Sequence, residues 1–191
     1  MASLVLSGDT SGSITVSAPA VAGSTTQTLV NVTGTLAPIV SGTAVSASST
    51  SVDFTGIPSW VKRITVMLNG VSTNGTSNWL VQLGDSGGIE TTGYSARAIT
   101  LTNNTGATST AGFISTAVVL AANATSGSII ISLLDSTTNT WVSQGNLLDP
   151  TSYLHTASGV KALSATLDRV RITTVNGTDT FDAGTINLLW E

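Results

Sequence analysis

The chain has 191 residues, of which 8% are charged against about a quarter in an average protein; 41% are hydrophobic and the net charge is −4. Its six Lys and Arg residues make no basic footprint for nucleic acid, and the lack of cysteine excludes disulfides, thiol catalysis and most structural zinc sites. No apolar run approaches the roughly eighteen residues of a membrane-spanning helix, so neither nucleic-acid binding nor membrane insertion is expected.

The first part of the chain, residues 1–44, has no Lys or Arg and one acid, Asp9. Its β-branched and small residues are separated by Gly, Pro and Ser, which is typical of short strands and tight turns. The predicted strands and turns are Ser3–Ser7, Ser13–Ala18, Gln27–Val32, Gly8–Asp9 and Gly23–Ser24. The segment holds too few large side chains to form a core alone, so we expect it to pair with other copies or with the domain behind it, which we place at 45–191.

From about residue 50 onward, strand-like stretches recur roughly every ten residues, the spacing of a β-sandwich or barrel. In Lys62–Asn69, Ile64, Val66 and Leu68 occupy alternate positions, which predicts a half-buried strand. The other predicted strands are Asn78–Leu83, Ala96–Thr102, Gly112–Leu120, Ser128–Leu134, Asn139–Ser143, Val160–Leu167, Asp168–Thr174 and Thr185–Trp190. Asn176-Gly177 predicts a hairpin that joins the last two. With hardly any helix pattern, the predicted fold is all-β, a jelly-roll-like antiparallel β-sandwich preceded by a β-rich N-terminal segment.

One stretch of the sequence is similar to an enzyme motif. Asp85 lies in the run Leu83-Gly84-Asp85-Ser86-Gly87-Gly88, which resembles the Gly-Asp-Ser-Gly-Gly sequence around the nucleophile of chymotrypsin-like proteases. Ser86 would then be the nucleophile. That chemistry needs a histidine base oriented by an acid, usually upstream of the serine, whereas the one histidine, His155, lies downstream. The sequence therefore favours a Gly-rich loop with an Asx-type turn, and no enzymatic activity is expected.

Two further places offer ligand chemistry without a supporting pattern. His155 stands close to Asp149 in the sequence, but a single histidine in a loop is more often a surface or interface residue. Carboxylates at Asp135, or at Asp179 and Asp182, suit a hard cation, yet no EF-hand or repeat spacing accompanies them. We therefore predict no cofactor and no metal site.

The large aromatic residues are the main candidates for binding. An exposed ring stacks on a sugar because its flat face covers the apolar C–H surface of the saccharide. We name Trp79, Tyr94 and Trp141, together with the carboxylate of Asp85, as candidate contacts for a glycan or a protein partner. The alternative for each ring, and the commoner one, is packing in the core or at a subunit interface.

Two groups of stretches resemble bacteriophage proteins. A segment near the start of phage tail-fibre and other virion structural proteins is similar to Gly8–Val16, Ala18–Gly23 and Thr33–Ala37. A C-terminal domain of phage proteins is similar to Val52–Val66, Asn78–Asp85 and Asp168–Thr174. Together the two resemblances extend over nearly all of the chain.

The resemblance implies a structural protein of the virion, assembled in the bacterial cytoplasm, with no catalytic residues. We expect a small homotrimeric tail fibre or adhesin whose N-terminal segment, which has strand edges to pair, provides attachment or trimerisation. The apolar residues expected in those contacts are Leu4, Leu6, Ile14, Val16, Leu29 and Leu36. The expected partners are further copies of the chain, tail or baseplate proteins, and a host surface glycan bound by the C-terminal sandwich.

Two other functions remain open at this point. A capsid decoration, cement or head-fibre protein on the outer shell is also an oligomer without catalysis, so the sequence separates it poorly from a tail fibre. A third hypothesis is a depolymerase that cleaves surface polysaccharide. Against it stand the small size of the chain and the lack of a clear pair of catalytic carboxylates.

Overall fold

The structure, a computed structural model, describes residues 3–7, 13–17, 38–149 and 153–191. The chain divides into two compact units, residues 1–36 and 37–191. The sequence placed this boundary at residue 44. In the structure Val40 is already paired with Trp190 of the last strand, so residues 38–44 belong to the larger unit.

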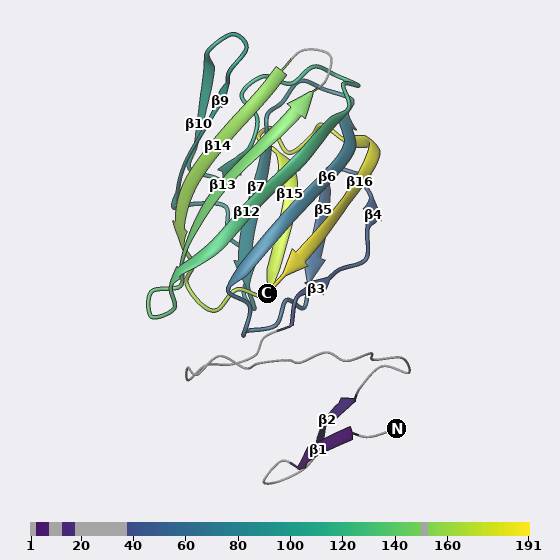
Figure 1. The fold of residues 1–191 in the computed structure, drawn as a ribbon. Coiled ribbons are helices and arrows are strands. Elements are labelled where there is room, and N and C mark those ends of the chain that lie inside the picture. The colour runs from purple at the N-terminus through teal and green to yellow at the C-terminus, as the bar shows by residue number, and fades with distance from the viewer. Residues whose placement is uncertain (1–2, 8–12, 18–37, 150–152) are drawn as a thin grey trace. The chain divides into compact units, whose positions relative to one another are not determined.

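The smaller unit contains a β-hairpin. β1 (Ser3–Ser7) and β2 (Ser13–Ser17) pair antiparallel, and their register joins Ser3 to Ser17 (Figure 1). Both strands were predicted, and both are confirmed; the third predicted strand, Gln27–Val32, lies outside the described residues. Within the described part of the chain neither strand has a second partner, so each leaves one edge of unpaired backbone groups. A two-stranded hairpin of this kind is only marginally stable in water.

The larger unit is built from two antiparallel sheets (Figure 1). The nine-stranded sheet contains β3 (Val40–Ser41), β4 (Val45–Ser46), β6 (Arg63–Thr73), β9 (Tyr94–Thr100), β10 (Thr105–Ser109), β12 (Thr125–Asp135), β13 (Thr140–Asp149), β14 (Tyr153–Ala162) and β16 (Phe181–Trp190). Its spatial order is β10-β9-β14-β13-β12-β6-β16-β3, and β4 also pairs with β16.

The five-stranded sheet contains β5 (Ser51–Thr55), β7 (Trp79–Asp85), β8 (Gly88–Ile89), β11 (Phe113–Ile114) and β15 (Arg169–Thr174). Its spatial order is β11-β7-β15-β5, with β8 paired to β7. The predicted all-β antiparallel sandwich is therefore confirmed. Among the described residues there is no helix long and apolar enough to cross a membrane.

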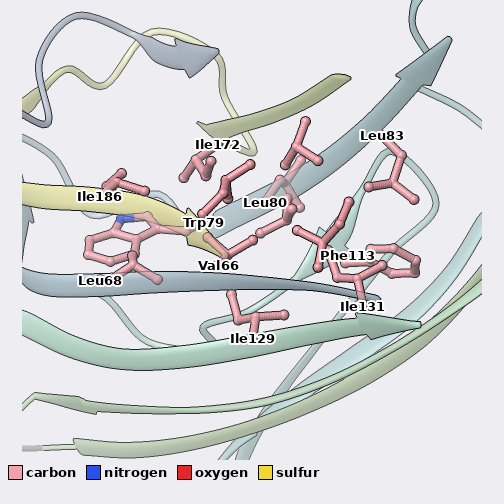
Figure 2. Packing of buried hydrophobic residues seen from close by; sticks show 14 of the residues in the cluster. Val66, Leu68, Trp79, Leu80, Leu83, Phe113, Ile129, Ile131, Ile172 and Ile186 are labelled. Atoms are coloured by element: carbon pink, nitrogen blue, oxygen red, sulfur yellow. The ribbon is translucent and has the colours of Figure 1, made fainter. Parts of the chain in front are cut away.

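The core lies between the two sheets because side chains alternate between the faces of each strand. Ile64, Val66 and Leu68 of β6 are buried, as their alternation predicted. Figure 2 shows Val66 and Leu68 among side chains of the smaller sheet, including Trp79 of β7 and Ile172 of β15. Burying one such side chain stabilises a fold by about 1.5–3 kcal/mol, so this layer is the main source of stability of the larger unit.

The predicted hairpin between the last two strands is wrong. β15 pairs with β7 and β5 of the smaller sheet, whereas β16 pairs with β6, β3 and β4 of the larger sheet. The turn itself is present: Gly177 has a φ of 67°, and its N–H donates to the carbonyl oxygen of Thr174 at 3.1 Å. Asn176-Gly177 thus signals a turn, but it does not determine the sheet that the chain enters next.

The limits of several strands differ from the prediction, most of all for two of them. Of the expected strand Gly112–Leu120, the structure retains Phe113–Ile114. The expected strand Val160–Leu167 overlaps only the end of β14, which begins at Tyr153. The inward positions of β14 explain the error because they carry small or polar residues instead of large apolar ones: His155, Ala157, Gly159 and Lys161.

Candidate functional site

Three adjoining hollows lie on the outer face of the larger sheet. The largest, of about 710 Å³, is lined by residues of β9, β10, β13 and β14. A second, of about 290 Å³, shares Arg97 and Ser158 with the first. A third, of about 210 Å³, shares Gln144 and Thr156 with the second. Because the three hollows share lining residues, we treat them as one surface, here called the outer trough, which extends over the neighbouring strands from β10 to β12. Four strand spacings make it about 19 Å long.

Arg97 lies where the first two hollows meet. The register places it opposite Ser158 of β14 and Thr108 of β10, and it places Ser158 opposite Gln144 of β13. Directly paired residues of neighbouring strands point to the same side of a sheet, so these four side chains form one row across the outer face. Gly106 of β10 makes room for the guanidinium: a Cβ at that position would lie 2.8 Å from Nη2 of Arg97.

The charges of the outer trough are unbalanced. Ion pairs to carboxylates are made by Arg63, Lys161, Arg169 and Arg171. Arg97 makes none with the described residues, and no described residue that lines the trough is acidic. The remaining lining combines hydroxyl and amide groups with aliphatic residues and Tyr94. Such a surface offers hydrogen bonds to a hydroxylated ligand and one unpaired guanidinium to an anion.

The aromatic residues named from the sequence lie inside the sandwich. Trp79, Tyr94 and Trp141 are 1%, 3% and 3% exposed. Trp79 packs edge-on against Phe181 with ring centroids 5.8 Å apart, and Tyr94 packs in the same way against Phe113 at 5.1 Å. A ring without an exposed face cannot stack on a sugar, so the packing alternative describes these three residues.

Asp85 is also buried and serves the loop that follows β7. Its Oδ1 accepts a hydrogen bond from the Gly87 N–H at 2.7 Å, which confirms the predicted Asx-type turn. Its Oδ2 accepts a second bond from the Ser164 hydroxyl at 2.7 Å. The hydrogen bond from Ser164, followed by that from Gly87, holds the pKa of Asp85 below its usual value. These bonds occupy the carboxylate, so Asp85 acts in the structure as a loop anchor.

An ion pair lies beside this loop. Lys161, 5% exposed, pairs with Glu90 and stands 5.2 Å from the ring centroid of Tyr94. Glu90 also accepts hydrogen bonds from Ser164, at 2.7 Å from its N–H and 2.8 Å from its hydroxyl. Burial acts to raise the pKa of Glu90, but the hydrogen bonds from Lys161 and Ser164 outweigh it and the pKa is lowered. The pair joins β14 to the segment after β8.

His155 is buried near the other end of β14. Its Nδ1 lies 3.0 Å from the Thr100 hydroxyl oxygen, and Asp149 acts on the ring electrostatically. Burial lowers the pKa of His155, against the opposing effect of Asp149. Six residues of extended strand, about 20 Å, separate His155 from Lys161, which contacts Glu90 beside the Asp85 loop. Ser86 and His155 are therefore too far apart for a protease-like pair.

The carboxylates considered as metal ligands bond to protein donors. Asp135 accepts hydrogen bonds from Thr137 and Thr138, and Asp179 accepts one from the Ser77 N–H at 2.9 Å. Asp182 accepts one from the Ser72 hydroxyl. No group of three or more His, Cys, Asp or Glu side chains that would suit a metal ion occurs among the described residues.

Four of the six residues expected in N-terminal contacts lie in the hairpin. The register pairs Leu4 with Val16 and Leu6 with Ile14. Leu29 and Leu36 lie outside the described residues. The structure therefore places the first four on paired strands of the smaller unit, and their role in attachment stays a prediction.

Arg97 was not singled out from the sequence. A usable signal existed, because Ser95, Arg97 and Ile99 occupy the alternate, outward positions of β9, where a lone cation among polar and aliphatic residues is conspicuous in a chain with so few charges. Its neighbours from β13 and β14 are far away along the chain and meet it only through strand pairing. Comparison with known proteins finds no matching family model, no similar curated protein and no similar solved structure.

Proposed function

We propose that this chain is a structural protein of a bacteriophage particle: a small trimeric tail fibre or adhesin that docks through its N-terminal unit and displays the β-sandwich towards the host. The observation that carries the proposal is the division of the chain into two unequal units. Among the described residues the hairpin has strand edges without a partner, and the described core lies entirely in the larger unit. A hairpin with edges that can pair, joined to a domain with its own hydrophobic core, suits attachment through the first and display of the second.

Self-association is supported by a leucine patch at one end of the larger sheet. Leu148 and Leu154 are directly paired on β13 and β14, and the Leu101 N–H donates to the carbonyl oxygen of Leu154 at 2.8 Å. The three residues are 49%, 41% and 55% exposed. Neighbouring apolar side chains left in water favour contact with another molecule, and we assign the patch to a second copy of the chain.

The first test of the trimer is the mass of the purified full chain by light scattering or sedimentation. Three chains of 19.2 kDa are expected to move as one species. Leu148→Ser combined with Leu154→Ser should shift the equilibrium towards the monomer. Leu134→Ser is the matched control, because Leu134 is 67% exposed on β12 outside the patch. A monomeric wild-type chain would refute the trimer.

The place in the particle is tested by a density map of intact phage. A few threefold bundles at the tail or baseplate would support the tail fibre or adhesin. Copies distributed over the capsid lattice would refute it in favour of a decoration or cement protein, with the N-terminal unit as a clamp between shell subunits. Absence of the chain from purified particles would refute both.

A further inference from the structure

We propose that the outer trough binds an acidic oligosaccharide, a chain of hydroxylated rings bearing carboxylate or phosphate groups, and that Arg97 pairs with the anionic group. This inference rests on the proposed function, since it names the class of host molecule that the displayed sandwich recognises. It assigns recognition to the outer face of the larger sheet and not to the aromatic residues in the core.

The shape of the trough favours an extended ligand. Its three hollows share lining residues and cross five strands, so a chain molecule can lie across them without leaving the surface. The exposed side chains along this path include hydroxyl and amide groups, among them Ser158, Thr108, Gln144 and Asn146. Each is both donor and acceptor, as is a sugar hydroxyl, so successive rings find hydrogen-bond partners along the trough.

The charge of the ligand follows from Arg97. Within the described part of the chain this guanidinium has no carboxylate partner, and no acidic side chain lines the trough. A guanidinium presents a planar fork of N–H donors that matches a carboxylate or phosphate oxygen pair. The net charge of −4 gives the whole protein no general attraction for anions, so an anionic ligand has to be held locally.

Gly106 leaves space for the guanidinium of Arg97. The side chain of Arg97 passes over this residue of β10, where an added Cβ would meet Nη2 at 2.8 Å, Cζ at 3.4 Å and Nε at 3.6 Å. A methyl group at position 106 therefore displaces the guanidinium without removing its charge. This separates the effect of position from the effect of charge.

Binding is tested with the full chain by isothermal titration calorimetry. The probes are an oligogalacturonate and a phosphorylated mannan oligosaccharide, each beside its neutral counterpart, the methyl ester and the dephosphorylated chain. We expect one acidic probe to bind and its neutral counterpart to bind at least about tenfold more weakly, because a charge-assisted hydrogen bond is lost. The acidic probe that binds identifies the source of the anion.

Variants locate the site. Arg97→Gln should weaken binding at least about tenfold, and Gly106→Ala should also weaken it while the net charge stays the same. Lys62→Gln is the matched control, since it removes one exposed cation outside the trough and should leave binding unchanged. Circular dichroism and the denaturation midpoint show that each variant is folded.

Three results would overturn the inference: no binding of either acidic probe, equal losses in Arg97→Gln and Lys62→Gln, or a lower oligomer mass in Arg97→Gln, which would mean that a second copy covers the trough. None of these results would contradict the proposed position of the chain in the phage particle. Failure of the density map to find the chain in the virion would in turn leave the binding result standing, so the two failures are distinguishable.

Discussion

Removal of the Tyr94 hydroxyl group tests how the two sheets are joined. Tyr94 belongs to β9 of the larger sheet, and its Oη accepts a hydrogen bond from the Leu83 N–H of β7, in the smaller sheet, at 2.7 Å. The same hydroxyl lies 3.1 Å from the carbonyl oxygen of Glu90 and 3.3 Å from that of Leu83. Tyr94→Phe keeps the ring against Phe113 and deletes only this bridge.

The expected cost comes from the orphaned N–H group. Leu83 is 0% exposed, so water does not replace the lost acceptor. A buried donor left without a partner costs about 1–3 kcal/mol, whereas the carbonyl of Leu83 still accepts from the Glu90 N–H at 3.0 Å. We expect a loss of about 2 kcal/mol in the free energy of unfolding. This corresponds to a fall of about 4–8 °C in Tm, or about 1 M in the urea midpoint.

The assay is urea unfolding followed by tryptophan fluorescence, combined with amide hydrogen exchange at Leu83. Tyr153→Phe is the matched control, because Tyr153 is half-buried and its hydroxyl makes no hydrogen bond with the described residues. It should change stability by less than about 0.5 kcal/mol. If Tyr94→Phe proves as stable as this control and the Leu83 amide stays protected, the cross-sheet hydrogen bond does not stabilise the fold and the reasoning fails.

Three further changes test other parts of the sandwich. Glu90→Gln should lower the free energy of unfolding by about 3 kcal/mol, because it leaves the buried ammonium group of Lys161 without its carboxylate partner. Lys161→Met should lower it by less, and equal losses in urea unfolding would contradict this reasoning. The pKa of His155 is lowered from 6.5 by burial, so the unfolded chain takes up a proton first and stability should fall as pH drops below about 6.5; a His155→Gln variant that keeps the same slope would disprove the assignment. Gly184→Ala should destabilise the protein by about 3 kcal/mol, since φ is 86° and a Cβ would lie against the Gly70 carbonyl. Gly177→Ala, where φ is 67° and the space is open, should destabilise it by about 1 kcal/mol. Thermal unfolding measures both losses, and similar values would argue against the close approach at Gly184.

Periodic and local signals account for what could be predicted. The alternation of Ile64, Val66 and Leu68 identified both a strand and its buried face, because side chains at every second position of a strand share one side of the sheet. The Gly-rich sequence after Asp85 predicted an Asx-type turn, since an aspartate in a turn can accept a hydrogen bond from the N–H two residues later without any contact from a distant segment. The strand limits were less accurate where β14 turns Ala157 and Gly159 inward, since small residues leave no hydrophobic pattern.

The pattern along one strand tells which residues share a face, but not which face becomes the interior. Only strand pairing and the burial of the whole set of apolar side chains decide that, and they placed Tyr94 inside and Arg97 outside on the same strand. Pairing also brought Arg97 and Ser158 side by side, although they are separated by many residues along the chain. The all-β class, the low charge and the local turns thus follow from the amino-acid sequence. Contacts between distant segments decide three other features: the outer trough, the interior position of the aromatic residues and the separation of β15 from β16. A local sequence pattern cannot predict these features, because it does not show which distant segments will pair.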